Sequence, residues 1–277
     1  METCIKCIEK NKVVIEEMPI RKLQDDDVIV SMKYTLISNG TEKSRLMGTY
    51  NSETKFPYIP GYSGVGIVKD TGKKVLSVKP GDRVFVSHGG HASVNIKRES
   101  SLVKIPEKVS DIDAVYAKIA SFPMHALRRT HFEFGESVVI VGLGMLGLFG
   151  VQLAKIGGAL PIVAIGNRDE RRELAYKFGA DYVFEPQKEK LVEEVINVAS
   201  ITGKGADVII ETSGTTEGLN LALQYVAKNG RISLVGCNRV TEHPIDLWKL
   251  HLKGVQLVGA NASTQKNYET MDCKEKL

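Results

Sequence analysis

Residues 138–155, VVIVGLGMLGLFGVQLAK, place glycines between a run of β-branched residues and a run with helical spacing, which predicts a helix from Met145 to about Ile156. Gly142 permits a tight turn after the strand, Gly144 lets a ligand approach the backbone, and Gly147 lets helix and strand pack closely. This spacing is a weak signal by itself. Between a strand and a helix, however, it is the arrangement that binds the pyrophosphate of a dinucleotide at the helix N-terminus.

The residues after the next strand favour NADP over NAD. In NAD-binding proteins an acidic residue about 20 positions further on binds the ribose hydroxyls. Here PIVAIGNRDERR holds Gly166, Asn167 and Arg168 at that distance. Arg168 can bind a 2′-phosphate through two parallel hydrogen bonds, and Arg171 and Arg172 add positive charge one turn later. The alternative is a solvated helix start that binds nothing. Four further positions are assigned to the cofactor site: Met145, Leu146, Thr212 and Gly236.

The chain divides into two parts with different periodicity. Before residue 120, short β-branched runs alternate with Gly, Pro and Asp, which predicts an all-β module of barrel or sandwich type. From Ser137 onward, apolar strands alternate with amphipathic helices, which predicts a parallel sheet covered on both faces. We therefore expect a β-rich domain over 1–120, an α/β domain over 121–263 and a polar tail over 264–277.

Composition narrows the class of protein. Of the 277 residues, 43% are apolar and 25% are charged, as in soluble globular proteins. The net charge of +4 gives no basis for nucleic-acid binding, and no apolar run reaches the roughly 18 residues of a membrane span. The charged start is no signal peptide, and four cysteines without paired spacing suit a reducing cytoplasm. We expect a cytoplasmic protein that acts on a small molecule.

Two cysteines and two histidines have spacings that resemble metal ligands. Cys4 and Cys7 form one Cys-x-x-Cys, and His88 and His91 form one His-x-x-His. The cysteines lie in a segment that alternates like a strand, where this spacing directs the two side chains to opposite faces. We therefore expect no metal site there.

Taken together, the motifs resemble the medium-chain dehydrogenase/reductase superfamily. The resemblance rests on PGDRV, VVIVGLGMLG, QLAK, ELAYKFGAD and DVIIETSG, which follow in the family's order and span nearly the whole chain. It implies an α/β protein with a GroES-like catalytic domain and a Rossmann domain, a doubly wound parallel sheet. The segment from Gly166 to Arg168 is also similar to that of the NADP-preferring members.

The resemblance also implies that the metals of this superfamily are missing. Its zinc alcohol dehydrogenases hold the catalytic metal through a Cys, a His and a later Cys or Asp. Matched without gaps, this chain has Asn39, Tyr62 and Ala117 at those positions, and it lacks the four-cysteine structural lobe. Zinc requires thiolate, imidazole or carboxylate ligands. SNGTE, PGYSGVG and GGHAS are most similar to a zinc-lacking branch whose substrates are poorly defined.

Hydride transfer without a metal needs a group that donates or accepts one proton. Tyr62 brings a phenol to the vacant metal position, and Lys118 can lower its pKa or polarise the substrate oxygen. Thr41 lies at the hydroxyl of the zinc enzymes' proton relay, and His91 is a candidate acid. Each of these residues also has a purely structural interpretation, such as a small core for Tyr62 and solvent exposure for Lys118.

We interpret the chain as a zinc-independent, NADP(H)-dependent oxidoreductase. It would transfer hydride between the nicotinamide and a carbonyl or alcohol on a polar or sugar-like substrate. Two alternatives stay open: an enoyl or quinone reductase of the same superfamily, and an NADPH-binding protein without turnover.

Two expectations concern the last part of the chain. Residues 254–263, GVQLVGANAS, are typical of a last strand at a sheet edge. Family members pair this strand across a two-fold axis, so we expect a homodimer. The sequence also stops before the segment with which the family completes its catalytic domain. We therefore expect a truncated form with an exposed apolar patch and weak turnover.

Overall fold

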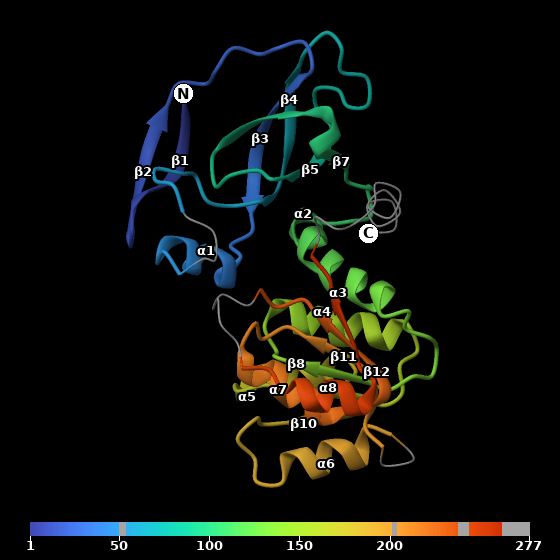
Figure 1. Ribbon diagram of the computed structural model, residues 1–277. Helices are drawn as coiled ribbons and strands as arrows, with labels where there is room; N and C mark the ends of the chain where they lie inside the picture. The colour runs from blue at the N-terminus through green and yellow to red at the C-terminus, as the bar shows by residue number, and fades with distance from the viewer. Residues whose placement is uncertain (50–53, 201–203, 238–243, 262–277) are drawn as a thin grey trace. The chain divides into compact units, whose positions relative to one another are not determined.

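A computed structural model describes residues 1–49, 54–200, 204–237 and 244–261 (Figure 1). The chain forms two compact units, the first from Met1 to Lys118 and the second from Ile119 onward. The predicted polar tail over 264–277, and the last two residues of the predicted final strand, lie outside the described residues. None of the helices in the described ranges is both long and apolar enough to span a membrane.

The first unit consists mainly of antiparallel strands. A hairpin of two strands accompanies a five-stranded sheet with the order β6-β3-β4-β5-β7. The elements are β1 (Glu2–Glu9), β2 (Lys12–Met18), β3 (Asp27–Thr35), α1 (Asn39–Leu46), β4 (Ser63–Thr71), β5 (Arg83–Ser87), β6 (Val94–Arg98), the 3-10 turn η1 (Glu99–Ser101), β7 (Leu102–Lys104) and α2 (Asp111–Val115). The predicted β-rich character of this part is confirmed.

The five-stranded sheet buries side chains on both of its faces. Val28, Val30 and Val84 belong to a valine-rich core on one face. Val65 and Phe85 belong to a second core, which includes residues of α2. Neighbouring positions of a strand point to opposite faces, so runs such as RVFVS supply both cores at once.

The second unit contains a six-stranded parallel sheet with the order β10-β9-β8-β11-β12-β13. Its elements are α3 (Ala117–Arg129), β8 (Val138–Val141), α4 (Met145–Ile156), β9 (Ile162–Ile165), α5 (Asp169–Lys177), β10 (Tyr182–Phe184), α6 (Leu191–Val198), β11 (Ala206–Glu211), α7 (Thr216–Tyr225), β12 (Val226–Leu234), α8 (Leu247–Lys253) and β13 (Gln256–Gly259). The doubly wound parallel sheet and the helix from Met145 are confirmed. The order of strands reverses between β8 and β11, which is where such sheets bind their ligands.

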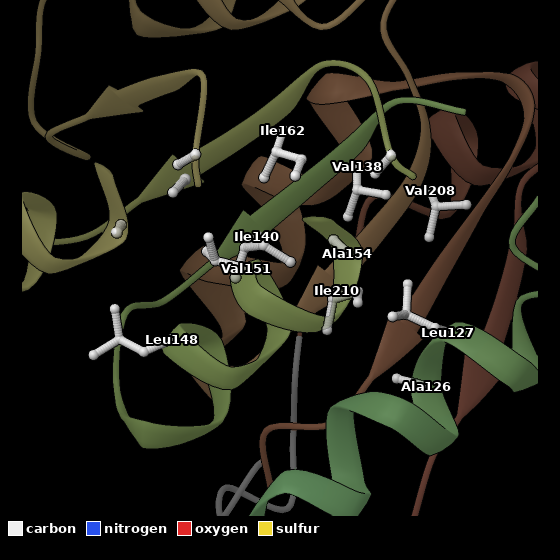
Figure 2. Close-up of a cluster of buried hydrophobic side chains, with 14 of the residues drawn as sticks. Ala126, Leu127, Val138, Ile140, Leu148, Val151, Ala154, Ile162, Val208 and Ile210 are labelled. Carbon is white, nitrogen blue, oxygen red and sulfur yellow. The ribbon is translucent and has the colours of Figure 1, made fainter. Parts of the chain in front are cut away.

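Helices cover both faces of this sheet. Figure 2 shows one of the two cores, in which Ala126 and Leu127 of α3 and Val151 of α4 pack with Ile140 and Ile210 of the central strands. The alternate residues of the same strands enter the other core, together with residues of α6 and α7. The central strands therefore have apolar residues at successive positions, as in VVIV of β8 and VII of β11.

Candidate cofactor site and candidate active site

The glycine turn follows β8 at the point where the strand order reverses. Gly142 has φ +95°, and a Cβ added to it would lie 2.8 Å from the backbone nitrogen of Ser213. A Cβ added to Gly147 would lie 1.9 Å from the carbonyl oxygen of Gly142. Real Cβ atoms do not approach other atoms this closely. These two positions therefore admit no side chain unless the turn itself moves.

Gly144 differs from its two neighbours. It is exposed, and a Cβ added to it would meet nothing within 4 Å. Gly144 is also the N-cap of α4 and has no side chain to cap the helix. The N–H groups of the first turn, including those of Met145, Leu146 and Gly147, have no acceptor within the helix. Open space beside unpaired N–H groups fits the pyrophosphate of a dinucleotide.

Thr212 and Gly236 shape this turn from the neighbouring strands. The Thr212 hydroxyl donates to the carbonyl oxygen of Gly142 at 2.7 Å. A Cβ added to Gly236 would lie 2.3 Å from the backbone nitrogen of Gly214. The Thr212 hydroxyl and the Gly236 backbone both lie against other parts of the backbone. They help to hold the ends of β11 and β12 beside the glycine turn.

Glu211, a buried carboxylate at the end of β11, was not predicted from the sequence. Its side chain accepts hydrogen bonds from the N–H groups of Ser213 at 2.7 Å and Gly214 at 3.1 Å. Burial raises the pKa of the Glu211 carboxyl above its ordinary value, while the hydrogen bonds from Ser213 and Gly214 oppose that rise. Glu211 therefore fixes the loop that lies against Gly142. An acidic residue directly before Thr-Ser-Gly is its signal in the sequence.

The segment after β9 contains a glycine, Gly166, where no side chain fits, and an exposed arginine, Arg168. A Cβ added to Gly166 would lie 2.7 Å from the side chain of Leu143, so an acidic residue does not fit there. Arg172 donates to the Gly166 carbonyl at 2.7 Å and pairs with Asp169. Arg168 is the exposed N-cap of α5, and its guanidinium forms no hydrogen bond or ion pair with any described residue. Arg168 is therefore available to bind an anion.

The other two predicted residues of this segment lie on either side of Arg168. Asn167 is exposed between β9 and α5. Arg171 is half-buried in the first turn of α5, and its backbone N–H donates to the Arg168 carbonyl at 3.1 Å. Both residues are polar, and both adjoin the position where the sequence predicts the 2′-phosphate.

A network of polar side chains lies in the first unit. The Tyr62 hydroxyl donates to Ser38 Oγ at 2.8 Å, and the Ser38 N–H donates to Glu42 Oε1 at 2.8 Å. Glu42 Oε2 lies 2.8 Å from His91 Nε2, and His91 Nδ1 lies 2.8 Å from Thr35 Oγ1. Residues from the end of β3, the start of α1 and the segments before β4 and β6 thus meet at one place.

This network changes the interpretation of His91. Its side chain is only 5% exposed, and both ring nitrogens have protein partners. His91 is a candidate acid from the sequence, and in the structure its ring bonds Glu42 and Thr35. Glu42, its partner, was not predicted. The residue stands in SNGTE, but nothing in that motif identifies a histidine far along the chain as its partner.

Thr41 and Lys118 are not part of the described bonds of this network. Thr41 is half-buried in the first turn of α1, and its carbonyl accepts from the Ser44 hydroxyl at 3.0 Å. Lys118 is half-buried in the first turn of α3. The Ser63 hydroxyl donates to the Val115 carbonyl at 2.7 Å, so the end of α2, shortly before Lys118, is held beside the residue that follows Tyr62.

The residues at the expected metal position do not fit zinc. Tyr62 is bonded to Ser38, Asn39 is exposed at the start of α1, and Ala117 has no donor atom. Within the described ranges, no group of three His, Cys, Asp or Glu residues is placed to hold a metal ion.

The two N-terminal cysteines are buried separately. Cys4 Sγ lies 3.6 Å from the sulfur of Met18. Cys7 pairs through its backbone with Tyr58. Their surroundings are therefore those of core thiols.

Known proteins resemble both units. The family model "Alcohol dehydrogenase GroES-like domain" matches residues 24–126, and "Zinc-binding dehydrogenase" matches residues 146–274. The L-threonine 3-dehydrogenase of Caldanaerobacter subterraneus subsp. tengcongensis is 29% identical, over 98% of this chain and 85% of that protein. The D-guloside 3-dehydrogenase of Shigella flexneri is 32% identical, over 73% of this chain and 58% of that protein.

A solved structure shows the same fold at lower identity. The galactitol-1-phosphate dehydrogenase of Escherichia coli superimposes with a TM-score of 0.86 at 19% identity, over 99% of this chain and 88% of that one.

Proposed function

Because the chain belongs to the zinc-type alcohol dehydrogenase-like proteins of the medium-chain dehydrogenase/reductase superfamily, we propose that this oxidoreductase works with NADP(H) and without a catalytic zinc. It transfers hydride between the cofactor and a carbonyl or alcohol group. The observation that carries the proposal is the hydrogen bond from Tyr62 to Ser38 at 2.8 Å, because Tyr62 is the residue that the resemblance aligns with a zinc ligand and its phenol is a proton donor.

NADP(H) supplies the hydride when it is bound. The N–H groups at the start of α4, beside the open space at Gly144, would hold the pyrophosphate. The guanidinium of Arg168 would hold the 2′-phosphate. The close contact between Gly166 and Leu143 supports this choice, because it leaves no room for the acidic residue that NAD-binding proteins use.

Tyr62 performs the proton transfer. During reduction its hydroxyl gives a proton to the substrate oxygen as hydride reaches the carbonyl carbon, and the product is an alcohol. Ser38 Oγ, 2.8 Å from the phenol oxygen, accepts the phenol's hydrogen bond before the transfer and can donate its own hydrogen to the phenolate afterwards.

The substrate class follows from the relatives. Those named for L-threonine and D-guloside support a polar substrate that bears hydroxyl groups. We therefore propose a polyol, a sugar or a similar secondary alcohol as the substrate.

Tyr62→Phe tests this function. The variant removes one oxygen, so it should keep its melting temperature and its NADPH affinity, measured by cofactor fluorescence. Its NADPH oxidation on a panel of sugar ketones and hydroxyketones should fall by about 10²–10⁴-fold. Tyr34→Phe, at an exposed position on β3, is the matched control.

Three results would contradict the proposal. Wild-type turnover by Tyr62→Phe would exclude the phenol as proton donor. Turnover of enones or quinones alone would favour reduction of carbon–carbon or quinone bonds. NADPH binding without turnover of any compound by the wild type would favour a binding protein.

We also propose a homodimer that pairs through β13. Among the described strands β13 pairs with β12 alone, and a second copy would pair along its other edge. A monomer in light scattering at micromolar concentration would refute the dimer.

The free thiols of Cys4, Cys7 and Cys237 support a reducing compartment such as the cytoplasm.

A further inference from the structure

We infer that Glu42 and His91 are positioning residues that hold Ser38 within hydrogen-bond distance of Tyr62. The catalytic meaning of this inference rests on the proposed function, whereas its geometry does not.

The start of α1 shows why Glu42 is needed. A serine at a helix N-cap normally accepts a hydrogen bond through its side chain from an N–H of the first turn. Ser38 caps α1 without such a bond, because its oxygen accepts from Tyr62 instead. Glu42 compensates by reaching back to the Ser38 N–H at 2.8 Å, while its own N–H donates to the Ser38 carbonyl at 2.9 Å. The main chain of Ser38 is thus held from both sides, and its hydroxyl is left for Tyr62.

The His91 ring bridges the connection on which Ser38 lies. Nδ1 contacts Thr35, the last residue of β3, and Nε2 contacts Glu42 in α1, each at 2.8 Å. Ser38 stands between these two anchors. The Glu42 side chain is 14% exposed and that of His91 is 5% exposed, so water offers little competition for these bonds.

His91 also contacts the segment that carries Tyr62. Its N–H donates to the Pro60 carbonyl at 2.7 Å. A Cβ added to Gly61, whose φ is +103°, would lie 2.9 Å from the backbone nitrogen of His91 and 3.1 Å from the ring. The glycine directly before Tyr62 therefore lets the ring lie against the backbone. His91 thus holds both the connection that carries Ser38 and the segment that carries Tyr62. It therefore sets the distance between the phenol and the serine. Catalytic groups must be held within about 0.5 Å of the productive geometry, which this arrangement can achieve.

The experiment observes Tyr62 directly. Protein labelled with carbon-13 at Cζ of tyrosine gives one NMR signal per tyrosine, and the signal absent from Tyr62→Phe belongs to Tyr62. Ser38→Ala defines the signal of Tyr62 without its serine partner. We expect Glu42→Ala and His91→Ala to move the Tyr62 signal to the Ser38→Ala position. Lys43→Ala, at an exposed neighbour in α1, should leave it unchanged.

Two further variants separate positioning from folding. Glu42→Asp is one methylene too short to reach both Ser38 and His91, yet it keeps the charge, so it should also move the signal. Glu42→Gln keeps an acceptor for the Ser38 N–H and a polar partner for His91, so it should restore the wild-type signal. A purely structural pair would lower the melting temperature in Glu42→Asp without moving the signal. That result would overturn the inference even if Glu42→Ala fails to fold.

Kinetics provide a second readout. If the wild type reduces a panel ketone, Glu42→Asp should lower kcat by up to about 10²-fold and leave the KM for NADPH unchanged. An unchanged kcat would overturn the positioning role. If the wild type reduces no ketone, the proposed function fails, and the NMR signal still decides whether Glu42 and His91 position Tyr62.

Discussion

The two units form their candidate sites from different groups, the second from backbone and the first from side chains. In the second unit, Gly142, Gly147 and Gly236 admit no side chain, and the N–H groups of α4 would do the binding. In the first unit, Tyr62 and Glu42 belong to a network of side chains from separate segments. A site made of backbone is therefore sensitive to any added atom. A site made of side chains is sensitive to the loss of a single hydrogen bond.

The largest effect should come from adding one methyl group to the backbone site. A Cβ in Gly147→Ala would lie 1.9 Å from the Gly142 carbonyl, so α4 and the turn must separate. We expect the free energy of unfolding to fall by about 1–3 kcal/mol or more, with loss of NADPH binding. Denaturant unfolding and NADPH fluorescence measure the two effects.

Gly144→Ala is the matched control for that variant. Its added methyl meets nothing within 4 Å, so stability should change by less than about 0.5 kcal/mol. NADPH affinity should still fall, because the methyl occupies the space where the pyrophosphate would approach. Equal loss of stability in both variants would mean that the two glycines do not differ as described.

Arg168→Ala should have the next largest effect, on cofactor choice. NADPH should raise the melting temperature of the wild type more than NADH does at equal concentration. Removal of the exposed guanidinium should abolish most of that difference, because one charge-assisted contact is worth about 1.5–3 kcal/mol. Lys177→Ala, at the other end of α5, removes the same charge and should change nothing. Equal shifts with both cofactors in the wild type would disprove NADP preference.

A side-chain contact in the first unit gives an effect that depends on pH. Asp27 is 4% exposed, and its carboxylate accepts from Arg21 Nη2 at 3.0 Å and from the Gln24 N–H at 3.0 Å. The hydrogen bond from Arg21 holds the pKa of Asp27 below its ordinary value of 3.8. The folded pKa is thus lower than the unfolded one. The stabilisation is therefore complete above the ordinary value and is lost as pH falls through the folded pKa.

Asp27→Asn measures that stabilisation. At neutral pH the variant should lose about 1–3 kcal/mol, and its stability should converge with that of the wild type in acid. Asp25→Asn breaks only the exposed pair with Lys74 at 3.6 Å and should cost at most about 1 kcal/mol. A difference between Asp27→Asn and wild type that persists unchanged in acid would exclude the Arg21 contact as its cause.

The same contrast explains what could be predicted from the sequence. The glycine turn and the parallel strands depend on local spacing and on periodicity, so VVIVGLGMLG was sufficient to predict them. The bond between Glu42 and His91 joins residues 49 positions apart. No local pattern identifies that pair, because in the sequence each residue looks like an ordinary polar residue near a turn. Arg172 could not be distinguished from Arg168 for a similar reason, because only the folded chain shows Arg172 donating to Gly166.

The smallest expected effect is none at all, from removal of metal. Tyr62 bonds Ser38 and His91 bonds Glu42, and Asn39, Tyr62 and Ala117 offer no zinc site. Protein purified without a chelator should therefore carry well under one zinc per chain, and EDTA should leave the melting temperature unchanged. Stoichiometric zinc, with a lower melting temperature in EDTA, would show that Cys4, Cys7, His88 or His91 binds metal. The first unit would then be organised by an ion rather than by hydrogen bonds among its own side chains. That result would contradict the proposed role of Tyr62 as the proton donor.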